Sequence, residues 1–467
     1  MPLFKLKFAD GCLPSLQSNL LRDLARESFA VLLGRRSALD PTVIRIIGVR
    51  YPNDDGISSS GIGHVSPSKS YIYDVLKEIS QRLDVDALID VHTHPFSIAE
   101  ARFSSIDDQD EKSFRSFLDE HYPDLAYGSI VFSQTDYEAR LWVTHGRRLE
   151  AVPSLVLAQR PVEQIPRAGG VFESFPSATE LELYDRVSRV IGVPALRAIM
   201  QDQRILIVGL GGLGSLIAEN LVQMGFTSFI LVDPDRVELS NISRLGGATY
   251  RDALRQTKKV RVAKRRIRNL NPTAKVSALA YSVEDERVTK IASSASWIIV
   301  CTDNHASRLH AQRLSHDLFI PLISVGVNIT SSNGVITDES GEVLTCVNGS
   351  GVCLICSGRV NLTKVAQESH PLPSIREEIL ARGYVSGALV TEPAVKTLNA
   401  ILAAMATDML VDQYTGRRPS EILRVYENNL SPKIYSDLDT IPAGEGCFSC
   451  AISEPFGTPY VSSMIHN

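Results

Sequence analysis

The stretch RILIVGLGGLGSLIAENLVQMGFTSFILVD, residues 204–233, decides the fold. An apolar run enters a glycine-rich loop, an amphipathic helix pattern follows, and a second apolar run ends at Asp233. The loop carries its glycines at Gly209, Gly211, Gly212 and Gly214. This order predicts a strand, a phosphate-binding loop, a helix and a second strand. The helix N-terminus offers free N–H groups to an anion, and Asp233 is placed to reach a ribose hydroxyl.

The residues after this unit choose between two classes of nucleotide enzyme. The glycine pattern alone serves NAD and FAD enzymes as readily as ATP enzymes, so an ordinary dehydrogenase is the competing interpretation. The next segment reads DPDRVELSNISR and places Asp233, Asp235, Asn241 and Arg244 just beyond the strand end. A triphosphate and its metal would lie there, and a dehydrogenase has no need for the arginine. The segment therefore favours ATP.

With these residues the chain resembles the E1-like superfamily of ATP-dependent activating enzymes. The superfamily includes ubiquitin activators and the ThiF and MoeB sulfur-carrier adenylyltransferases. The resemblance implies that Lys259 grips phosphate, with Lys258 beside it as the alternative, and that Asp303 holds the metal or the adenylate. It also implies that Arg186, in Tyr-Asp-Arg, reaches across a dimer interface to the partner's ATP. Strand and helix patterns alternate beyond Arg244, which predicts a doubly wound α/β domain.

Two cysteine pairs with identical internal spacing follow the nucleotide motifs. They are Cys353-Leu-Ile-Cys356 and Cys447-Phe-Ser-Cys450. Two matched pairs can close a tetrahedral sulfur site for Zn²⁺. The E1-like family carries a structural zinc of this kind, so the resemblance implies the same role here.

The remaining cysteines bear on thioester chemistry. Ubiquitin activators carry a nucleophilic cysteine on a loop after the first zinc pair, but the matching segment, 357–387, contains none. The free cysteines are Cys12, Cys301 and Cys346. We therefore expect the adenylate to pass directly to an external thiol or sulfur donor. Cys346, near the active face, is the alternative nucleophile.

The N-terminal part contains a second set of candidate ligands. The run ALIDVHTHP, residues 87–95, predicts a buried strand that delivers His92 and His94 to one face. Asp107 in Ser-Ser-Ile-Asp can add a carboxylate ligand, which leaves a fourth position for water as in catalytic zinc sites. An isolated His-x-His is more often a hydrogen-bonded pair, so this prediction depends on the neighbouring motifs.

These motifs resemble the JAB (JAMM, MPN+) metalloproteases, whose pattern is a distant Glu, then His-x-His-Pro, then Ser-x-x-Asp. The resemblance implies that His92, His94 and Asp107 bind zinc. It assigns the proton shuttle to Glu27, in ESFAVLLG, and oxyanion stabilisation to Ser104. The segment between Pro95 and Ser104 is longer than usual for the family, so Asp108 is the alternative to Asp107.

Length and composition support a two-domain protein. The chain has 467 residues, of which 44% are hydrophobic and 22% charged, with a formal charge of −5. These values argue against a nucleic-acid partner, and neither a signal peptide nor a membrane-spanning run is evident, so we expect a cytoplasmic protein. We predict an α+β JAB zinc metalloprotease domain at 1–150, a Pro- and Gly-rich linker at 151–178, and a Rossmann-like ThiF/E1 adenylation domain at 179–467.

Together the resemblances imply one function. The E1-like domain adenylates the C-terminal glycine of a ubiquitin-like or sulfur-carrier protein with ATP and Mg²⁺, and the zinc site of the JAB domain processes or deconjugates the same modifier. The implied partners are that carrier, an E2-like protein, and a second copy in a homodimer through the E1 domain. The alternatives are carrier activation for sulfur transfer to a metabolite, and a non-catalytic regulatory scaffold.

Overall fold

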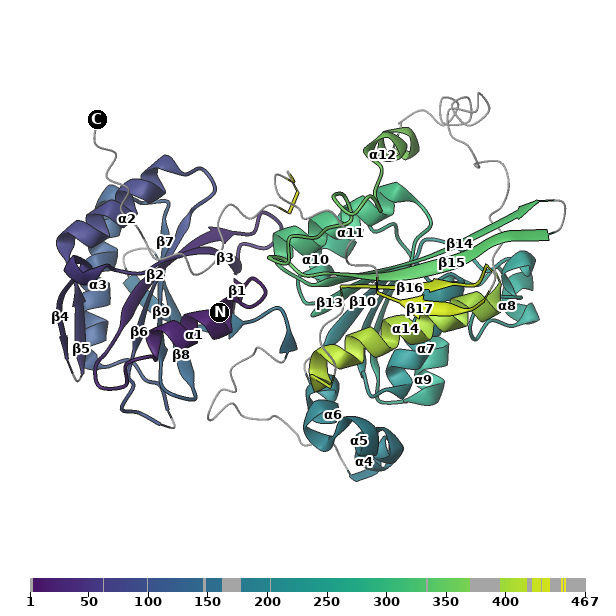
Figure 1. Cartoon of the computed structure of the whole chain (residues 1–467), viewed down its shortest axis with the longest axis horizontal. Helices are drawn as coiled ribbons and strands as arrows, with labels where there is room; N and C mark the ends of the chain where they lie inside the picture. Colours follow the sequence, from purple (N-terminus) through teal and green to yellow (C-terminus); the bar gives the residue numbers. More distant parts are fainter. Residues whose placement is uncertain are drawn as a thin grey trace. The chain divides into compact units, whose positions relative to one another are not determined.

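A computed structural model describes residues 3–450 except 62, 99, 146–147, 162–177, 202, 333–334, 370–394, 418–421, 430, 437–446 and 448. The chain divides into two compact units, with the division after residue 173 (Figure 1).

The first unit is built on a closed barrel of seven strands in the order β1-β3-β2-β6-β7-β8-β9. The strands are β1 (Phe4–Phe8), β2 (Phe29–Arg36), β3 (Val43–Arg50), β6 (Ala87–Thr93), β7 (Ala126–Phe132), β8 (Tyr137–His145) and β9 (Arg148–Leu157). A hairpin of β4 (Ile57–Gly61) and β5 (His64–Pro67) lies outside it, and the helices are α1 (Cys12–Leu20), α2 (Lys69–Gln81) and α3 (Ser105–His121).

Strand β6 is the centre of this unit. It pairs antiparallel with β2 and parallel with β7, and all 7 of its residues are buried. A strand covered on both faces is largely apolar, as Ala87–Ile89 and Val91 are here. Helices α2 and α3 pack on the outside of the barrel, through Val75 and Leu118 among others. The ends of β6 and α3 thereby become fixed positions for functional side chains.

The linker predicted at 151–178 begins later in the structure than the sequence indicated. Strand β9 continues to Leu157, so residues 151–157 belong to the barrel. Pro153 suggested a linker because proline lacks an N–H. In the structure Pro153 is the last β9 residue paired with β8, and Ser154 is the first paired with β1. A missing N–H disturbs the sheet little at such a change of partner.

The second unit contains an 8-stranded sheet in the order β12-β11-β10-β13-β14-β15-β16-β17. The strands are β10 (Arg204–Val208), β11 (Ser228–Val232), β12 (Lys275–Leu279), β13 (Trp297–Val300), β14 (Leu322–Ser332), β15 (Val335–Cys346), β16 (Leu423–Glu427) and β17 (Lys433–Tyr435). The helical segments are α4 (Ala178–Leu183), α5 (Asp185–Ile191), α6 (Val193–Met200), α7 (Gly212–Gln223), η3 (Leu239–Asn241), α8 (Tyr250–Leu254), α9 (Lys259–Leu270), α10 (Glu286–Ala292), α11 (His305–Leu318), α12 (Leu362–Glu368) and α14 (Lys396–Thr415).

Strands β12, β11, β10, β13 and β14 run parallel, which confirms the Rossmann-like α/β prediction for this half of the sheet. Helices α7, α9 and α14 cover one face and α10 and α11 the other, as Figure 1 shows. The chain moves outward from β10 to β12 and then returns to β13 on the other side of β10. The edge between β10 and β13 is therefore the switch point where ligands of doubly wound sheets bind.

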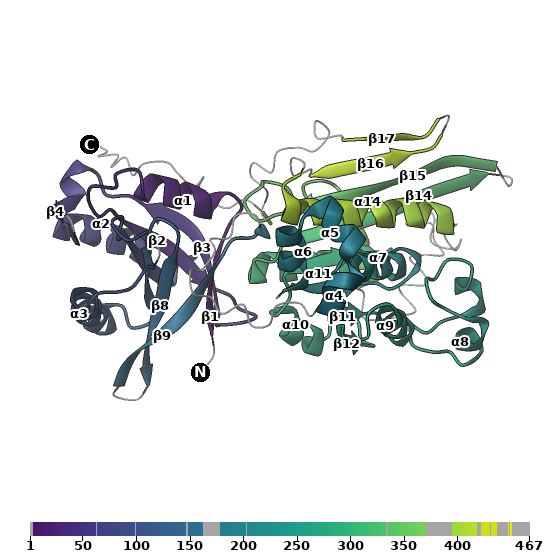
Figure 2. The same ribbon diagram turned by 90° about the horizontal axis from the view of Figure 1, so that it is seen from below.

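The sheet continues antiparallel through β15, β16 and β17, which the sequence had not predicted (Figure 2). The long β14–β15 pair carries the chain back across the sheet, and β15 ends at Cys346, shortly before the first cysteine pair. The antiparallel half thus supports the segment that carries the candidate metal ligands.

Candidate active sites

The glycine loop lies at the carboxyl end of β10, where α7 begins. Gly209 has a φ of 88°, in the region that favours glycine. A Cβ at Gly214 would lie 1.9 Å from the carbonyl oxygen of Gly209, and one at Gly212 would lie 2.2 Å from Nδ2 of Asn399. A larger residue at Gly214 would push α7 away from the strand, and one at Gly212 would displace the Asn399 side chain of α14. The glycines therefore let the N–H groups of the α7 N-terminus lie at the sheet edge.

Asp233 braces this loop from the end of β11. Its carboxylate accepts the N–H of Leu210 at 2.7 Å and the N–H of Asp235 at 2.8 Å. Burial raises the pKa of Asp233, and the charge of Lys259 opposes that effect. Each carboxylate oxygen keeps a second lone pair, so the group can still accept a bond from a ribose hydroxyl.

The two neighbouring lysines have different partners. The ammonium group of Lys259 lies 2.8 Å from Oδ2 of Asp235, whereas Lys258 donates to the carbonyl of Pro234. Lys259 is therefore the lysine held among the acidic side chains beyond β11. This placement favours it over Lys258 as the phosphate-binding residue.

Asn241 and Arg244 are positioned by the turn η3. The buried side chain of Asn241 accepts the N–H of Glu238 at 3.2 Å, which closes the turn. Arg244 makes a weak bond to the carbonyl of Ser240 at 3.4 Å. The turn thus fixes the backbone, while the guanidinium group can rearrange toward a phosphate.

Asp303 and Arg308 follow β13. Asp303 is exposed just beyond the strand end. Arg308 donates to the carbonyl of Thr302 at 3.0 Å, to the hydroxyl of Ser324 at 3.0 Å and to the carbonyl of Val325 at 3.2 Å. Arg308 therefore ties the ends of β13 and β14 together and holds the segment that presents Asp303.

Arg186 lies on α5, which Tyr184 anchors. The buried Tyr184 hydroxyl donates to the carbonyl of Val222 at 2.9 Å and accepts a bond from Asn271 at 3.0 Å. Arg186 is exposed, and within the described part of the chain no ion pair is formed by its side chain. Its charge is thus available to a ligand or to another copy of the chain.

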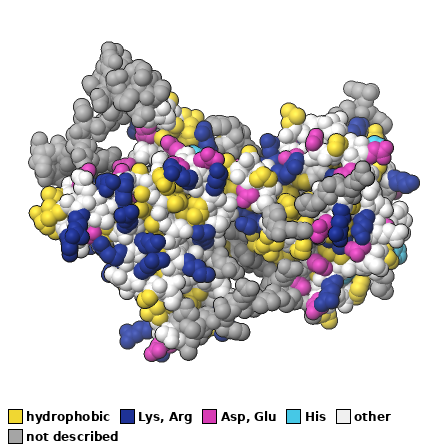
Figure 3. Space-filling model, turned by 180° about the vertical axis from the view of Figure 1, so that it is seen from behind, with side chains coloured by type: hydrophobic (Ala, Val, Ile, Leu, Met, Phe, Trp, Pro, Cys, Tyr) yellow, Lys and Arg dark blue, Asp and Glu magenta, His cyan; other side chains and the backbone are white. Residues whose placement is uncertain are grey.

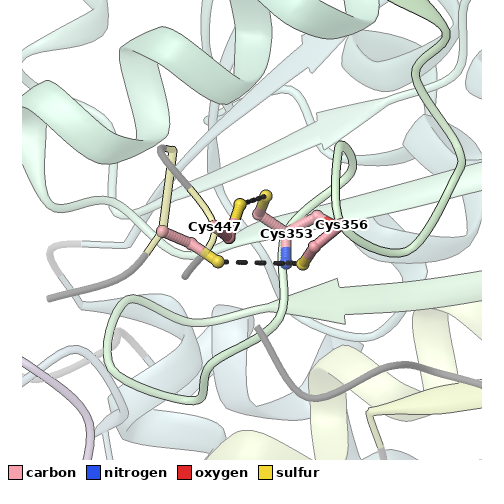
Figure 4. A group of neighbouring side chains, drawn as sticks. Cys353, Cys356 and Cys447 are labelled. Carbon is pink, nitrogen blue, oxygen red and sulfur yellow. Dashed lines mark hydrogen bonds between the residues drawn. The ribbon is translucent and has the colours of Figure 1, made fainter. Parts of the chain in front are cut away.

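The four paired cysteines converge as the sequence predicted. Their sulfur atoms all lie within 4.8 Å of one another, with 3.9 Å between Cys353 and Cys447 and 3.7 Å between Cys356 and Cys450 (Figure 4). Tetrahedral zinc with bonds of about 2.3 Å requires sulfur separations of about 3.8 Å. The four thiols fit a structural zinc ion, and Cys356 Sγ accepts the Cys353 N–H at 3.1 Å.

In the first unit, His92, His94 and Asp107 bring their ligand atoms within 4.8 Å of one another. Nε2 of His92 lies 3.5 Å from Asp107 Oδ1, and Nε2 of His94 lies 3.9 Å from Asp107 Oδ2. Ligands at about 2.0–2.1 Å from tetrahedral zinc are separated by about 3.3 Å, so the donor set fits a zinc ion with one open position. Strand β6 supplies His92, and His94 follows directly after its end.

The first turn of α3 fixes the choice between the two aspartates. Ser104 caps the helix, because its hydroxyl accepts the N–H of Asp107 at 3.2 Å and its own N–H donates to Asp107 Oδ2 at 2.6 Å. Burial alone would raise the pKa of Asp107, but His92 and these bonds outweigh it and lower the pKa. Asp108 instead pairs with Arg140 at 2.6 Å. The structure therefore places Asp107 with the histidines.

Glu27 precedes β2 and lies beside this group. Its carboxylate is buried, lies 3.7 Å from Nε2 of His94, and has one oxygen with no hydrogen-bond partner among the described residues. Burial raises the pKa of Glu27 to about 7, against the charge of His92, which lowers it. A carboxyl group with that pKa can accept and return a proton near neutral pH.

Comparison with known proteins identifies the second unit. A family model described as the ThiF family matches residues 184–450. The chain belongs to the ThiF family. The match leaves residues 1–183 outside it.

Relatives of the ThiF-family region include the sulfur carrier protein ThiS adenylyltransferase of Bacillus subtilis (strain 168), 31% identical over 163 residues, 35% of this chain and 46% of that protein. Ubiquitin-like modifier-activating enzyme 5 of Gallus gallus is 26% identical, covering 39% and 47%. Adenylyltransferase and sulfurtransferase UBA4 of Debaryomyces hansenii is 25% identical, covering 52% and 50%. The chain spans about half the length of the curated relatives it matches. A crystal structure of PaaA is similar with a TM-score of 0.44 at 19% identity, covering 57% of this chain and 86% of that one.

Cys346 does not have the environment of a nucleophile. Its side chain is 2% exposed in the ThiF-family core, and burial raises its pKa well above the ordinary value. Burial also raises the pKa of Cys301, to about 12. The sequence pointed to Cys346 because its position along the chain is close to the active face, but burial withholds the thiolate that reacts.

A buried polar group behind the histidine site was missed by the sequence analysis. Arg140 on β8 lies 2.9 Å from Glu111 Oε2 and stacks on Phe103, 3.7 Å from the ring centroid, while Phe103 in turn packs edge-on against His92. Trp142 donates to the same Glu111 oxygen at 2.6 Å. The sequence contains a signal for this group: Arg140 and Trp142 are two residues apart in a strand, so their side chains lie on the same face.

No helix within the described ranges has the length and apolar character that crossing a membrane requires. Helix α14, the longest of them at 20 residues, is instead packed in the core of the ThiF-family unit.

Replacing Cys353 by serine should remove one zinc ion per chain and destabilise the ThiF-family unit. We expect a loss of a few kcal/mol, which lowers Tm by roughly 5–10 °C. Metal analysis and thermal denaturation measure both effects, with Cys12→Ala as a matched cysteine variant that should keep the wild-type zinc content. A Cys353→Ser protein with the wild-type zinc content would contradict the four-cysteine site.

Proposed function

We propose that the ThiF-family unit adenylates the C-terminal glycine of a ubiquitin-like or sulfur-carrier protein. The observation that carries the proposal is the Lys259–Asp235 pair beside the glycine loop, at the carboxyl ends of β10 and β11. A dinucleotide site needs no such pair, whereas a triphosphate with its metal uses both charges. Relatives named sulfur carrier protein ThiS adenylyltransferase and adenylyltransferase and sulfurtransferase UBA4 support the same reaction.

In the proposed reaction the carrier's terminal carboxylate attacks the α-phosphate of ATP. Pyrophosphate leaves and the carrier keeps the adenylyl group as an acyl-adenylate. Lys259 and Arg244 offset the charge that builds on the phosphate oxygens, and the α7 N-terminus binds phosphate. Asp303 and Asp235 would hold Mg²⁺, which would supply charge neutralisation when bound. Carrier-dependent exchange of pyrophosphate into ATP tests this reaction.

We also propose that the first unit is a JAB-type zinc hydrolase acting on the same carrier. Support comes from the side chains alone: His92, His94 and Asp107 match a catalytic zinc set, and Glu27 lies beside them. Zn²⁺ held there would polarise a carbonyl and lower the pKa of a bound water. Glu27 would take the proton of the attacking water, and the Ser104 hydroxyl would donate to the oxyanion.

Sulfur transfer is the second candidate outcome of the adenylation. Outside the four-cysteine group, the free thiols Cys12 and Cys346 are buried and Cys301 is half-buried. A direct handover of the adenylate to an external sulfur donor fits this chain better than a thioester on the chain itself. An E2-like acceptor would favour conjugation instead. Absence of pyrophosphate exchange with every carrier would favour the regulatory scaffold.

The adenylating unit should act as a homodimer in which Arg186 reaches the partner's nucleotide. Arg186→Ala and Asp303→Ala proteins should each lack pyrophosphate exchange, and an equal mixture should recover about a quarter of it, because random pairing leaves one intact site in half of the dimers. Arg189→Ala is the control, since Arg189 pairs with Asp185 on the same helix at 2.7 Å.

If subunits mix and no exchange returns, Arg186 does not act across the interface. Native mass spectrometry of the mixture shows whether mixed dimers form, so the two explanations for a negative result are separated.

A further inference from the structure

The ThiF-family unit carries an exposed apolar group that its nucleotide site does not use. Tyr250 and Leu254, one turn apart on α8, are 64% and 63% exposed, and Leu239 on the adjoining turn η3 is 57% exposed. Below them Val237, Ala253 and Val262 form a small core that anchors both segments. We name the exposed surface of Leu239, Tyr250, Leu254, Arg251 and Arg255 the α8 face.

Arginines lie next to this apolar group, since Arg251 and Arg255 directly follow Tyr250 and Leu254 in the chain. Arg251, Arg255, Arg265 and Arg266 line a hollow of about 540 Å³ next to α8. Arg265 is neutralised by Asp252, with bonds of 2.8 and 2.7 Å, and Arg266 by Glu219 at 2.5 Å. Arg251 and Arg255 are exposed and form no ion pair with a described residue.

The positive charge continues along α9. Arg261 and Arg268 are also exposed on that helix. Figure 3 shows dark blue side chains gathered over α8 and α9, at the left of the view, with few acidic ones between them. The excess charge of this surface is therefore positive.

The α8 face belongs to the same connection as the nucleotide-binding residues. This connection, residues 233–259, begins with Asp233 and ends with Lys259, and α8 lies within it. An isolated bridge between Arg236 and Lys258 closes its two ends together. A protein docked on α8 would thus contact the same connection that carries Asp233 and Lys259.

Composition and charge indicate what covers this surface. Tyrosine and arginine around a small apolar centre are typical of protein interfaces, and exposed apolar groups of this kind mark binding sites. In a symmetric dimer the same patch would meet itself, so the unpaired arginines would face each other. A second copy of the chain is therefore a poor occupant, and an acidic partner is a good one.

We propose that the α8 face docks an acidic surface of the carrier protein whose C-terminal glycine is adenylated. This inference rests on the proposed adenylation. Docking through residues distant from the reacting atoms affects capture of the carrier more than the chemical step. Reversing the charges should accordingly raise KM for the carrier and leave kcat unchanged.

The probe is chosen by activity from purified carrier proteins ending in glycine, including sulfur carrier ThiS and ubiquitin. The carrier that supports pyrophosphate exchange by the wild-type chain is used, together with a peptide of its last ten residues, which lacks the globular surface. The test variant is Arg251→Glu/Arg255→Glu. The control is Arg313→Glu, an exposed arginine on α11.

We expect the double variant to raise KM for the whole carrier by roughly tenfold, with kcat and the peptide KM unchanged. The Arg313→Glu protein should match the wild type. Tyr250→Ala should also raise the carrier KM, which tests the apolar centre separately. The wild-type KM should rise with salt, since exposed charges are screened.

Three results would overturn the inference. An unchanged carrier KM in the double variant, with exchange intact, removes the docking role and leaves the proposed adenylation in place. If the wild type binds single-stranded RNA and the double variant does not, with an unchanged carrier KM, the surface is assigned to nucleic acid. No exchange by the wild type with any carrier overturns the adenylation and the docking together.

Discussion

Glu27→Gln should reduce hydrolysis of a C-terminally extended carrier by about 10²- to 10⁴-fold while zinc stays bound. The carboxylate is the group that accepts a proton, and an amide of the same shape cannot do so. Glu27 is buried beside His94 and is not among the three side chains that form the ligand group. Release of the extension, followed by mass spectrometry, measures the rate, and metal analysis measures the zinc.

Two further variants make this result specific. His92→Ala should lose both zinc and activity, because it removes a ligand. Asp108→Asn, next to the proposed ligand Asp107, should keep most of the activity, because Asp108 pairs with Arg140 and not with the histidines. A Glu27→Gln protein that cleaves at the wild-type rate would show that the first unit is not a hydrolase of the JAB type.

Lys259→Ala should reduce carrier-dependent pyrophosphate exchange by about 10²- to 10³-fold, the usual cost of removing one charged stabiliser of a transition state. The fold should persist, since an ion pair with an exposed partner such as Asp235 contributes no more than about 1 kcal/mol. The exchange assay and a thermal denaturation curve on the same protein separate catalysis from stability.

Lys258→Ala is the matched control for this variant. Lys258 is adjacent in sequence but donates to the backbone carbonyl of Pro234, so we expect most of the exchange to remain. The reverse pattern, with exchange lost in Lys258→Ala and kept in Lys259→Ala, would move the phosphate-binding role to the other lysine and require a different orientation of ATP.

The features that the sequence predicted well depend on local spacing. The glycine loop follows a buried strand in the order that the physics of a phosphate loop requires, and the Rossmann-like half of the sheet appears with it. The two Cys-x-x-Cys pairs converge although about 90 residues separate them, because identical short spacings present paired sulfurs in the same way.

Other features depend on partners that only the folded chain brings together. The sequence favoured Asp107 and left Asp108 as the alternative, and the fold separates them because Ser104 engages the first and Arg140 the second. Pro153 predicted a linker because proline lacks an N–H. The sequence does not show that β9 changes its partner from β8 to β1 at this residue. Cys346 was a candidate nucleophile because it lies near the active face along the sequence. Its burial arises from the β14–β15 pair and the segment that follows.

The α8 face is another feature that could not be predicted from the sequence. From the sequence alone, a run of basic residues on a helix is usually a solvated surface. In the structure, exposed Tyr250 and Leu254 lie beside unpaired arginines, a combination that the linear order does not reveal.

The most direct test of the central claim is mass spectrometry of a glycine-terminated carrier protein incubated with this chain, ATP and Mg²⁺. The proposed adenylation predicts that the carrier gains one adenylyl group, that pyrophosphate is released in equal amount, and that a carrier lacking its terminal glycine is not modified. A carrier that stays unmodified while ATP is bound, across the whole panel of carriers, would contradict the claim and leave the ThiF-family unit as a nucleotide-binding scaffold.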